Sequence, residues 1–228
     1  MRIQSIILLV LLVAAPMLSA RTVRAIFLQP HRGAPKTAFL FTGTKSIEID
    51  LPRRNLSPQV EIPEGKVTLA VSQSKLTEGV EVPRGIQSVK IPAQWSRCLL
   101  VFIPKPNRPG FPAVVMAINS SDSNIAKGDT MVYNLSDALF IGKFGNQTQL
   151  SVRPRKSGIV KAPIDKRGSY PVAIDCVLPE TKKRSAICRT NWMHHPKARQ
   201  ILFVVPSSGQ KVPRVWGVLD RRDERKEP

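Results

Sequence analysis

The chain has 228 residues, of which 42% are hydrophobic and 22% charged. This composition suits a folded core and excludes a largely disordered chain, and the length allows one large or two ordinary domains. Lysine and arginine outnumber aspartate and glutamate by 35 to 16, a formal net charge of +19. Such an excess attracts anionic partners, among them acidic polysaccharides, anionic lipids and nucleic acids.

The first twenty residues have the pattern of a secretory signal peptide. Arg2 precedes an apolar run over residues 6–15, which is followed by Pro16 and by small residues up to Ala20; such signals have this charged, apolar and cleavage-site order. The apolar run is short for the roughly 30 Å hydrocarbon core of a bilayer, so an uncleaved anchor is the less favoured alternative. We expect a signal helix over residues 1–20, cleavage after Ala20 and export to the periplasm or extracellular space, with no transmembrane span afterwards.

The rest of the chain has the pattern of short strands separated by turns. Ile47, Ile49 and Leu51 alternate with polar or charged residues, which is the period of a half-buried strand. Residues 98–103 form a continuous apolar run, which indicates a strand that is buried on both faces or central in a sheet. The expected strands are 22–28, 38–41, 46–51, 59–62, 66–71, 80–82, 89–91, 98–103, 113–118, 130–134, 138–141, 148–152, 158–161 and 212–218, with a three-strand meander over 170–206.

Two of the three cysteines lie in that meander. Cys176 and Cys188 are symmetric about residue 182, so in a hairpin centred there they would face each other. Opposed positions are nearly close enough for a disulfide, and export permits one. We therefore predict a Cys176–Cys188 disulfide, and we expect Cys98 to be a buried thiol within its apolar run.

The chain also contains an internal similarity. Residues 97–104 and 199–206 each have an arginine, a polar or small residue, five apolar residues and a proline. A near-constant offset of 100 to 103 residues between matching segments predicts two homologous halves of about 100 residues each. The alternative is that unrelated sandwiches share similar strand spacing. The other matching segments are 47–49 with 150–152, 65–71 with 168–174, and Pro63 with Pro163.

We therefore predict an all-β fold with two immunoglobulin-like β-sandwich domains in tandem, since such domains have about 100 residues and roughly seven strands. The proline-rich stretch 105–112 is typical of a stiff linker or a connecting loop, and we place the domain boundary there. The expected domains are residues 21–108 and 109–219, followed by a mixed-charge tail over 220–228.

A signal peptide followed by this strand layout resembles uncharacterised exported bacterial proteins built from tandem immunoglobulin-like sandwiches. It resembles more distantly the small periplasmic accessory proteins of exopolysaccharide acetylation. The likeness implies an exported β-sandwich protein, and it assigns no functional residues because no specific motif carries it.

The sequence contains none of the common catalytic motifs, such as GxSxG, HExxH, the P-loop or GxGxxG. His194 and His195 are followed by Pro196 and are expected to form a turn between two strands. Their spacing from the cysteines matches no standard zinc pattern. We therefore expect no enzymatic activity, no metal and no cofactor, with a hydrolase that lacks recognisable motifs as an alternative.

Basic clusters are the remaining candidates for function. The expected function is an exported, non-enzymatic binding or structural protein that recognises an anionic polysaccharide or another envelope component, with no nucleic-acid partner. The alternative is a periplasmic assembly factor or chaperone-like protein that binds another envelope protein and exposes a long apolar edge strand. Trp192 is a candidate because aromatic faces stack on sugar rings, although a core or rim role is more usual for a strand-edge tryptophan. The candidate binding residues are Arg153, Arg155, Lys156, Lys182, Lys183, Arg184 and Trp192.

Overall fold

A computed structural model of the chain describes residues 21–79, 81–146 and 148–221. The predicted signal peptide and the residue before its cleavage site, Ala20, lie outside these ranges. The described residues form sixteen strands and no helix, so the prediction of an all-β fold is confirmed. It follows that no helix in these ranges is long and apolar enough to cross a bilayer.

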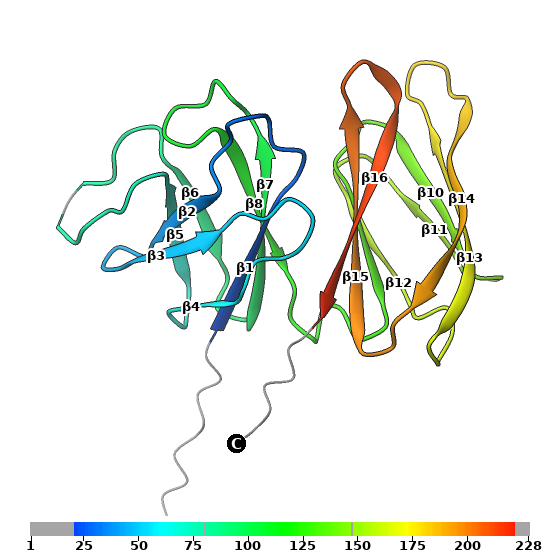
Figure 1. Ribbon diagram of the computed structural model, residues 1–228, viewed down its shortest axis with the longest axis horizontal. Coiled ribbons are helices and arrows are strands. Elements are labelled where there is room, and N and C mark those ends of the chain that lie inside the picture. The colour runs from blue at the N-terminus through cyan, green and yellow to red at the C-terminus, as the bar shows by residue number, and fades with distance from the viewer. Residues whose placement is uncertain (1–20, 80, 147, 222–228) are drawn as a thin grey trace, which may run out of the picture.

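The strands form four sheets of four strands each (Figure 1). Sheet A contains, in spatial order, β4 (Val60–Ile62), β1 (Arg21–Phe27), β7 (Arg97–Pro104) and β8 (Ala113–Asn119). Sheet B contains β3 (Ser46–Asp50), β2 (Thr37–Phe41), β5 (Val67–Ser72) and β6 (Gln87–Ile91). Sheet C contains β12 (Ser157–Val160), β9 (Thr130–Asn134), β15 (Ala198–Ser207) and β16 (Gln210–Arg221). Sheet D contains β11 (Thr148–Val152), β10 (Leu139–Phe144), β13 (Gly168–Val177) and β14 (Arg184–His194).

The observed strands agree with the expected ones in number and position, with one exception. The predicted strand over residues 80–82 is not found, because Glu81 and Val82 belong to no strand. The meander over 170–206 is confirmed as β13, β14 and β15. These strands are local features of the sequence, since alternating or continuous apolar runs are separated by proline and glycine turns.

Each half of the chain encloses one hydrophobic core between two sheets. Sheets A and B (N-terminal sheet pair) share a core that includes Phe27, Leu40, Leu69 and Phe102. Sheets C and D (C-terminal sheet pair) share a second core that includes Phe140 and Leu202 together with neighbouring valines. Two sheets that pack face to face over a common apolar core fit a β-sandwich arrangement.

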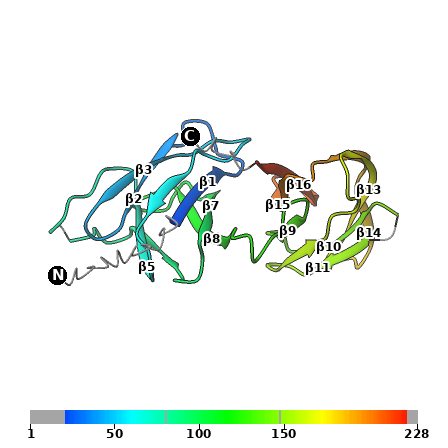
Figure 2. The same ribbon diagram turned by 90° about the horizontal axis from the view of Figure 1, so that it is seen from below.

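A third core joins the two sheet pairs, because sheets A and C also face each other. Ile26 of β1 and Val101 of β7 pack with Met131 of β9 and Ile201 and Phe203 of β15. The four sheets therefore form four layers in the order B, A, C and D, as the two perpendicular views show (Figures 1 and 2). Sheets A and C are the inner layers and are covered on both faces.

The inner position of β7 explains its continuous apolar run. Leu100 and Phe102 face the core between sheets A and B, whereas Leu99 and Val101 face the core between sheets A and C. All four side chains are at most 1% exposed. The prediction that this run is buried on both faces or central in its sheet is therefore confirmed.

The proline-rich stretch 105–112 is a connecting loop, the second of its two predicted roles, rather than a linker between domains. It connects β7 to β8, which pair antiparallel in sheet A, and its ends are joined by a hydrogen bond from Lys105 N to Pro112 O at 3.0 Å. The boundary predicted at residues 108 and 109 thus falls inside a hairpin loop. The chain crosses from sheet A to sheet C through residues 120–129 instead. Asp220, predicted as the first residue of the tail, lies in β16 and is buried.

The two halves have the same strand order. Adding eight to each strand number of sheets A and B gives sheets C and D in the same spatial order. The unusual parallel pair also recurs, since β1 pairs with β7 and β9 pairs with β15. Segments 97–104 and 199–206, which match in sequence, lie on the equivalent strands β7 and β15.

Candidate binding surface of the C-terminal sheet pair

The predicted disulfide is absent, since Cys176 and Cys188 are both free. Cys176 pairs with Ser185 across the hairpin, and Cys188 pairs with Ile174. The hairpin centre therefore lies closer to residue 180 than to 182, and a β-bulge shifts the register between the two cysteine positions. The prediction was wrong because the turn is centred between residues 180 and 181 rather than at residue 182, so that Ser185 lies opposite Cys176.

Two of the thiols, those of Cys98 and Cys176, are buried, and that of Cys188 is half-buried. Cys98 is 1% exposed, and burial raises the pKa of its thiol to about 12. Burial also raises the pKa values of Cys176 and Cys188 above the ordinary value for cysteine. Because the thiolate is the nucleophile and the metal ligand, all three side chains act as small apolar residues at neutral pH.

The two histidines end β14 and begin the following turn, as predicted. Ala198 N donates a hydrogen bond to His195 O at 3.0 Å, which closes the turn before β15. His194 is buried against Tyr170 with ring centroids 6.4 Å apart, and burial, together with the charge of His195, lowers its pKa. The adjoining cavity has a volume of about 10 Å³, enough for about one water molecule. No group of three potential metal ligands occurs among the described residues.

The six basic candidate residues gather at one end of the C-terminal sheet pair, although they come from two separate turns. The first turn, between β11 and β12, is hydrogen-bonded to Asn134 at the end of β9. The second turn joins β13 to β14, and Val177 at its start pairs with Leu139, the first residue of β10. Both turns therefore flank the short connection from β9 to β10. We call this the basic end; its residues are Arg153, Arg155, Lys156, Lys182, Lys183 and Arg184, all exposed.

Acidic side chains neutralise only part of the basic end. Arg155 pairs with Asp137 at 2.9 Å, and Arg184 pairs with Asp175, which it shares with Arg189 of β14. Burial raises the pKa of Asp175, but the hydrogen bonds and charges of Arg189 and Arg184 outweigh this effect and hold the pKa below its ordinary value. The other four residues of the basic end form no ion pair within the described ranges, so the end keeps a positive excess.

A groove lies beside the basic end, between the edge strands β14 and β16 of the C-terminal sheet pair. Its volume is about 610 Å³, within the usual range for ligand sites. Arg214 is the one charged residue among its described lining residues, and no acidic side chain lines it there. The main apolar lining residues are Ile187, Cys188, Trp192, Leu202, Val212 and Val215.

Trp192 is the one candidate residue that lies in the groove rather than at the basic end. Its ring packs on Phe144 with centroids 5.9 Å apart, so it also covers the core of the C-terminal sheet pair. Trp95 and Trp216 are likewise half-buried beside cores, but at the N-terminal core and the central core. The structure therefore brings Trp192 to a ligand-sized surface and leaves the other two tryptophans with packing roles.

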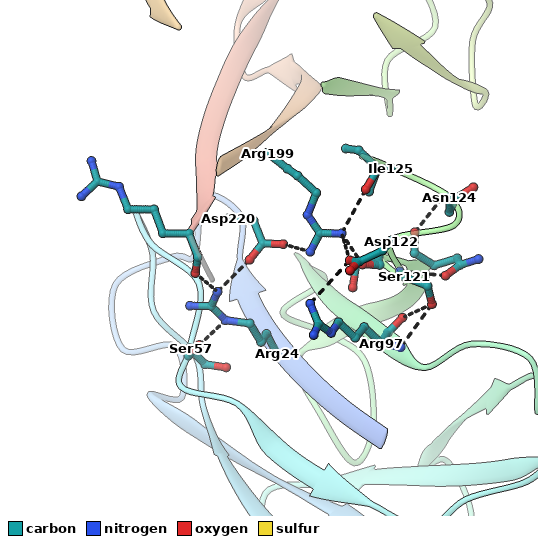
Figure 3. Close-up of polar contacts among 12 residues, drawn as sticks. Arg24, Ser57, Arg97, Ser121, Asp122, Asn124, Ile125, Arg199 and Asp220 are labelled. Atoms are coloured by element: carbon teal, nitrogen blue, oxygen red, sulfur yellow. Dashed lines mark hydrogen bonds and ion pairs between the residues drawn. The ribbon is translucent and has the colours of Figure 1, made fainter. Parts of the chain in front are cut away.

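A polar network at the junction of the sheet pairs was not predicted from the sequence (Figure 3). Arg24 of β1 donates to Asp220 Oδ1 of β16 at 2.8 Å and to Ser57 O at 2.7 Å. Arg199 of β15 donates to Asp220 Oδ2 and to the carbonyl of Ser120. Asp220 is thus held by an arginine from each half of the chain.

The same network includes the connection between the halves. Asp122 lies 3.5 Å from Arg97 Nη1 and 3.7 Å from Arg199 Nη1, so it is placed between the two matching arginines of β7 and β15 (Figure 3). Burial lowers the pKa of Arg199, an effect that Asp220 opposes. The only sequence signal for this network was the pair of arginines at equivalent positions in the two matching segments.

No known protein family matches the chain, and no curated protein resembles it significantly.

Proposed function

We propose that this chain is an exported, non-enzymatic binding protein of the cell envelope or extracellular matrix, and that its basic end holds an anionic polymer such as an acidic glycan. The observation that supports this is the convergence of six exposed basic residues from two turns on one end of the C-terminal sheet pair. Convergent positive charge raises the local concentration of a polyanion, and a polymer can contact several side chains at once.

We further propose that the two sheet pairs are tandem immunoglobulin-like sandwiches that arose by duplication. The identical strand order in the two halves supports this proposal, as does the position of the matching sequence segments on equivalent strands.

Export is part of the same proposal. The first residue after the predicted cleavage site, Arg21, begins β1 and is 3% exposed. Its side chain donates hydrogen bonds to the carbonyl oxygens of Gly65, Pro92 and Trp95. The residue that cleavage would leave first is thus fixed within the N-terminal sheet pair.

Chromatography on an immobilised acidic polysaccharide, for example polygalacturonate, tests the binding proposal. Residues 21–228 are expected to be retained at low ionic strength and released by salt, because the Debye length falls from about 10 Å at 0.1 M to about 3 Å at 1 M. A variant with Lys156→Gln, Lys182→Gln and Lys183→Gln is expected to elute at lower salt.

The matched control removes the same charge from the N-terminal sheet pair. Its substitutions, Lys45→Gln, Arg53→Gln and Arg54→Gln, lie at exposed positions, and this variant is expected to elute close to the unmodified chain. No retention at low ionic strength contradicts the proposal. Equal loss of retention in both variants would show that net charge, rather than the basic end, determines binding.

A further inference from the structure

A glutamine side chain closes the gap between the edge strands β6 of sheet B and β8 of sheet A in the N-terminal sheet pair. We call such a gap between the edge strands of two packed sheets a seam. Gln87 Nε2 donates to the carbonyl oxygen of Val115 at 2.6 Å, and Val115 N donates to Gln87 Oε1 at 2.9 Å. The carboxamide therefore pairs with both backbone polar groups of Val115, as a neighbouring strand would. These two groups lie on the free edge of β8, which is the outer strand of sheet A.

The equivalent seam in the C-terminal sheet pair lacks this glutamine. Gln87 pairs with Val71 of β5, and Cys188 pairs with Ile174 of β13. Positions 71 and 174 correspond in the matching segments 65–71 and 168–174, so Cys188 occupies the position of Gln87. A thiol is only a weak donor and a weak acceptor on a single atom, so it does not replace the two-point pairing of a carboxamide, and at this seam the groove opens instead.

The backbone of β16 presents the same free edge as that of β8. Val115 pairs with Phe102 of β7, and Val215 pairs with Val204 of β15, where positions 102 and 204 correspond. The N–H and C=O of Val215 accordingly face the groove. Pro213 is two residues away and has the same orientation, so its missing N–H falls on the free edge, where proline is tolerated.

The charges on the two edge strands specify what kind of segment suits the groove. Arg184 and Arg189 lie on β14, and Lys211, Arg214 and Arg221 lie on β16. The single acidic residue of both strands is Asp220, which is buried against Arg199 and Arg24 away from the groove lining. The surface on either side of the groove is therefore positive, although Asp175 partly neutralises Arg184 and Arg189.

We propose that the groove between β14 and β16 binds an extended polypeptide segment of a partner protein, in which apolar and acidic side chains alternate. The segment adds a strand to β16 by pairing with the backbone of Val215, where Gln87 supplies this pairing in the other half. An added strand obtains affinity from main-chain hydrogen bonds and specificity from pockets for alternate side chains. Its apolar side chains cover Ile187, Leu202 and Val212, and its acidic side chains lie near Arg214.

This site differs from the basic end, although Arg184 flanks both, and its occupant is protein rather than glycan. Alternation of side chains along a strand places every second residue on one face, which suits a groove that is apolar inside and positive outside. An exposed edge strand of this length is a ready template for pairing with another chain. The inference does not depend on glycan binding at the basic end.

Binding is measured by fluorescence anisotropy with a synthetic, end-capped peptide in which glutamate and valine alternate. The first comparison is with the same peptide carrying N-methyl groups on the amides of one edge, which cannot donate to β16. Removing these hydrogen bonds is expected to weaken binding by about tenfold or more. The second comparison replaces every glutamate by lysine, which is expected to abolish binding by like-charge repulsion at Arg214.

A substitution that installs the missing amide tests the site within the protein. Cys188→Gln is expected to close the seam as Gln87 does, to abolish peptide binding and to maintain or raise the melting temperature. Asn191→Gln introduces the same side chain at an exposed position of β14 outside the groove lining. This control is expected to bind the peptide as the unmodified chain does.

The inference is overturned if the N-methylated or the lysine peptide binds as tightly as the original one. It is also overturned if the folded Cys188→Gln variant keeps full affinity, or if an acidic polysaccharide displaces the peptide from a chain in which the three lysines of the basic end are replaced by glutamine. Where Cys188→Gln fails to fold, the two peptide comparisons still decide the outcome.

Discussion

Single side chains determine how the two sheet pairs meet. Arg24 and Arg199 come from different halves of the chain and both bind Asp220, which is buried together with Arg199, whereas Arg24 is half-buried. Removing one partner of a buried ion pair leaves an uncompensated charge. The free energy of unfolding lost in this way exceeds the net contribution of the intact pair. Asp220 is therefore expected to contribute strongly to the stability of the junction between the sheet pairs, although it lies near the end of the last strand.

We predict that Asp220→Ala lowers the free energy of unfolding by about 3–5 kcal/mol, because two arginines lose a buried partner. Urea denaturation followed by tryptophan fluorescence measures this change. Asp137→Ala is the matched control, since its pair with Arg155 is 64–73% exposed and such a pair contributes at most about 1 kcal/mol. Similar losses in the two variants would contradict the assigned role of Asp220.

Asp175 gives a prediction that depends on pH. Its folded-state pKa is held below the ordinary value by Arg189 and Arg184 despite the opposing effect of burial. A lowered carboxyl pKa stabilises the fold above the unfolded-state pKa of about 3.9, and this contribution is lost as the pH falls through the folded-state pKa.

We therefore expect the unmodified chain to be more stable than Asp175→Asn at pH 7. The difference is expected to shrink as the pH falls below about 4, since both chains then carry an uncharged side chain there. Thermal melting curves of the two chains over this pH range measure it. A difference that stays constant on acidification would show that the charge of Asp175 has no stabilising role.

At the scale of strands, the hairpin of β13 and β14 determines the state of the cysteines. The register places Cys176 opposite Ser185 and Cys188 opposite Ile174. We predict that the unfolded, unreduced protein reacts with iodoacetamide at all three cysteines, which mass spectrometry counts directly. Modification at only one cysteine would show that a disulfide forms and that the register of the hairpin differs.

The strands were predictable because their signals are local. Alternating apolar residues such as Ile47 and Ile49, and turns rich in proline and glycine, act over a few residues. The hairpin centre was not predictable in this way, because the polar stretch 179–184 does not specify which of its residues occupy the centre of the turn. Composition alone could not decide between the two predicted roles of the stretch 105–112, since proline-rich linkers and proline-rich hairpin loops share it, and the domain boundary was therefore placed there.

The basic residues of the candidate surface were visible as short runs in the sequence, but their convergence was not. Lys156 and Lys182 meet at one end because sheets C and D pair distant strands. The groove was invisible for another reason. The groove opens where Cys188 stands in place of a glutamine. This difference can be recognised only by comparison with Gln87, whose carboxamide closes the gap between β6 and β8 in the other half.

At the scale of the whole molecule, the central core between sheets A and C couples the two sheet pairs. Phe203 is fully buried there and stacks on Tyr133 with centroids 6.2 Å apart. We predict that calorimetry shows a single unfolding transition for residues 21–228. Phe203→Ala is expected to lose about 3–5 kcal/mol and to divide the transition into two.

Phe102→Ala is the control for this prediction, because Phe102 is equally buried but lies in the core of the N-terminal sheet pair. It is expected to lower the melting temperature without separating the two halves. If the unmodified chain already melts in two steps, the central core does not couple the halves.

In the inner sheets A and C, the register of a strand is determined differently from that of a strand with one solvent-exposed face. In most strands a slip of one residue moves apolar side chains into water, and this penalty sets the register. In β7 a slip would only exchange Leu99 and Leu100 between two cores, so solvent exposure cannot select the correct alignment. The residues at the ends of the run must do so, namely Arg97, with its ion pair to Asp122, and Pro104. The same arginine and proline flank the apolar run of β15, where the same ambiguity arises.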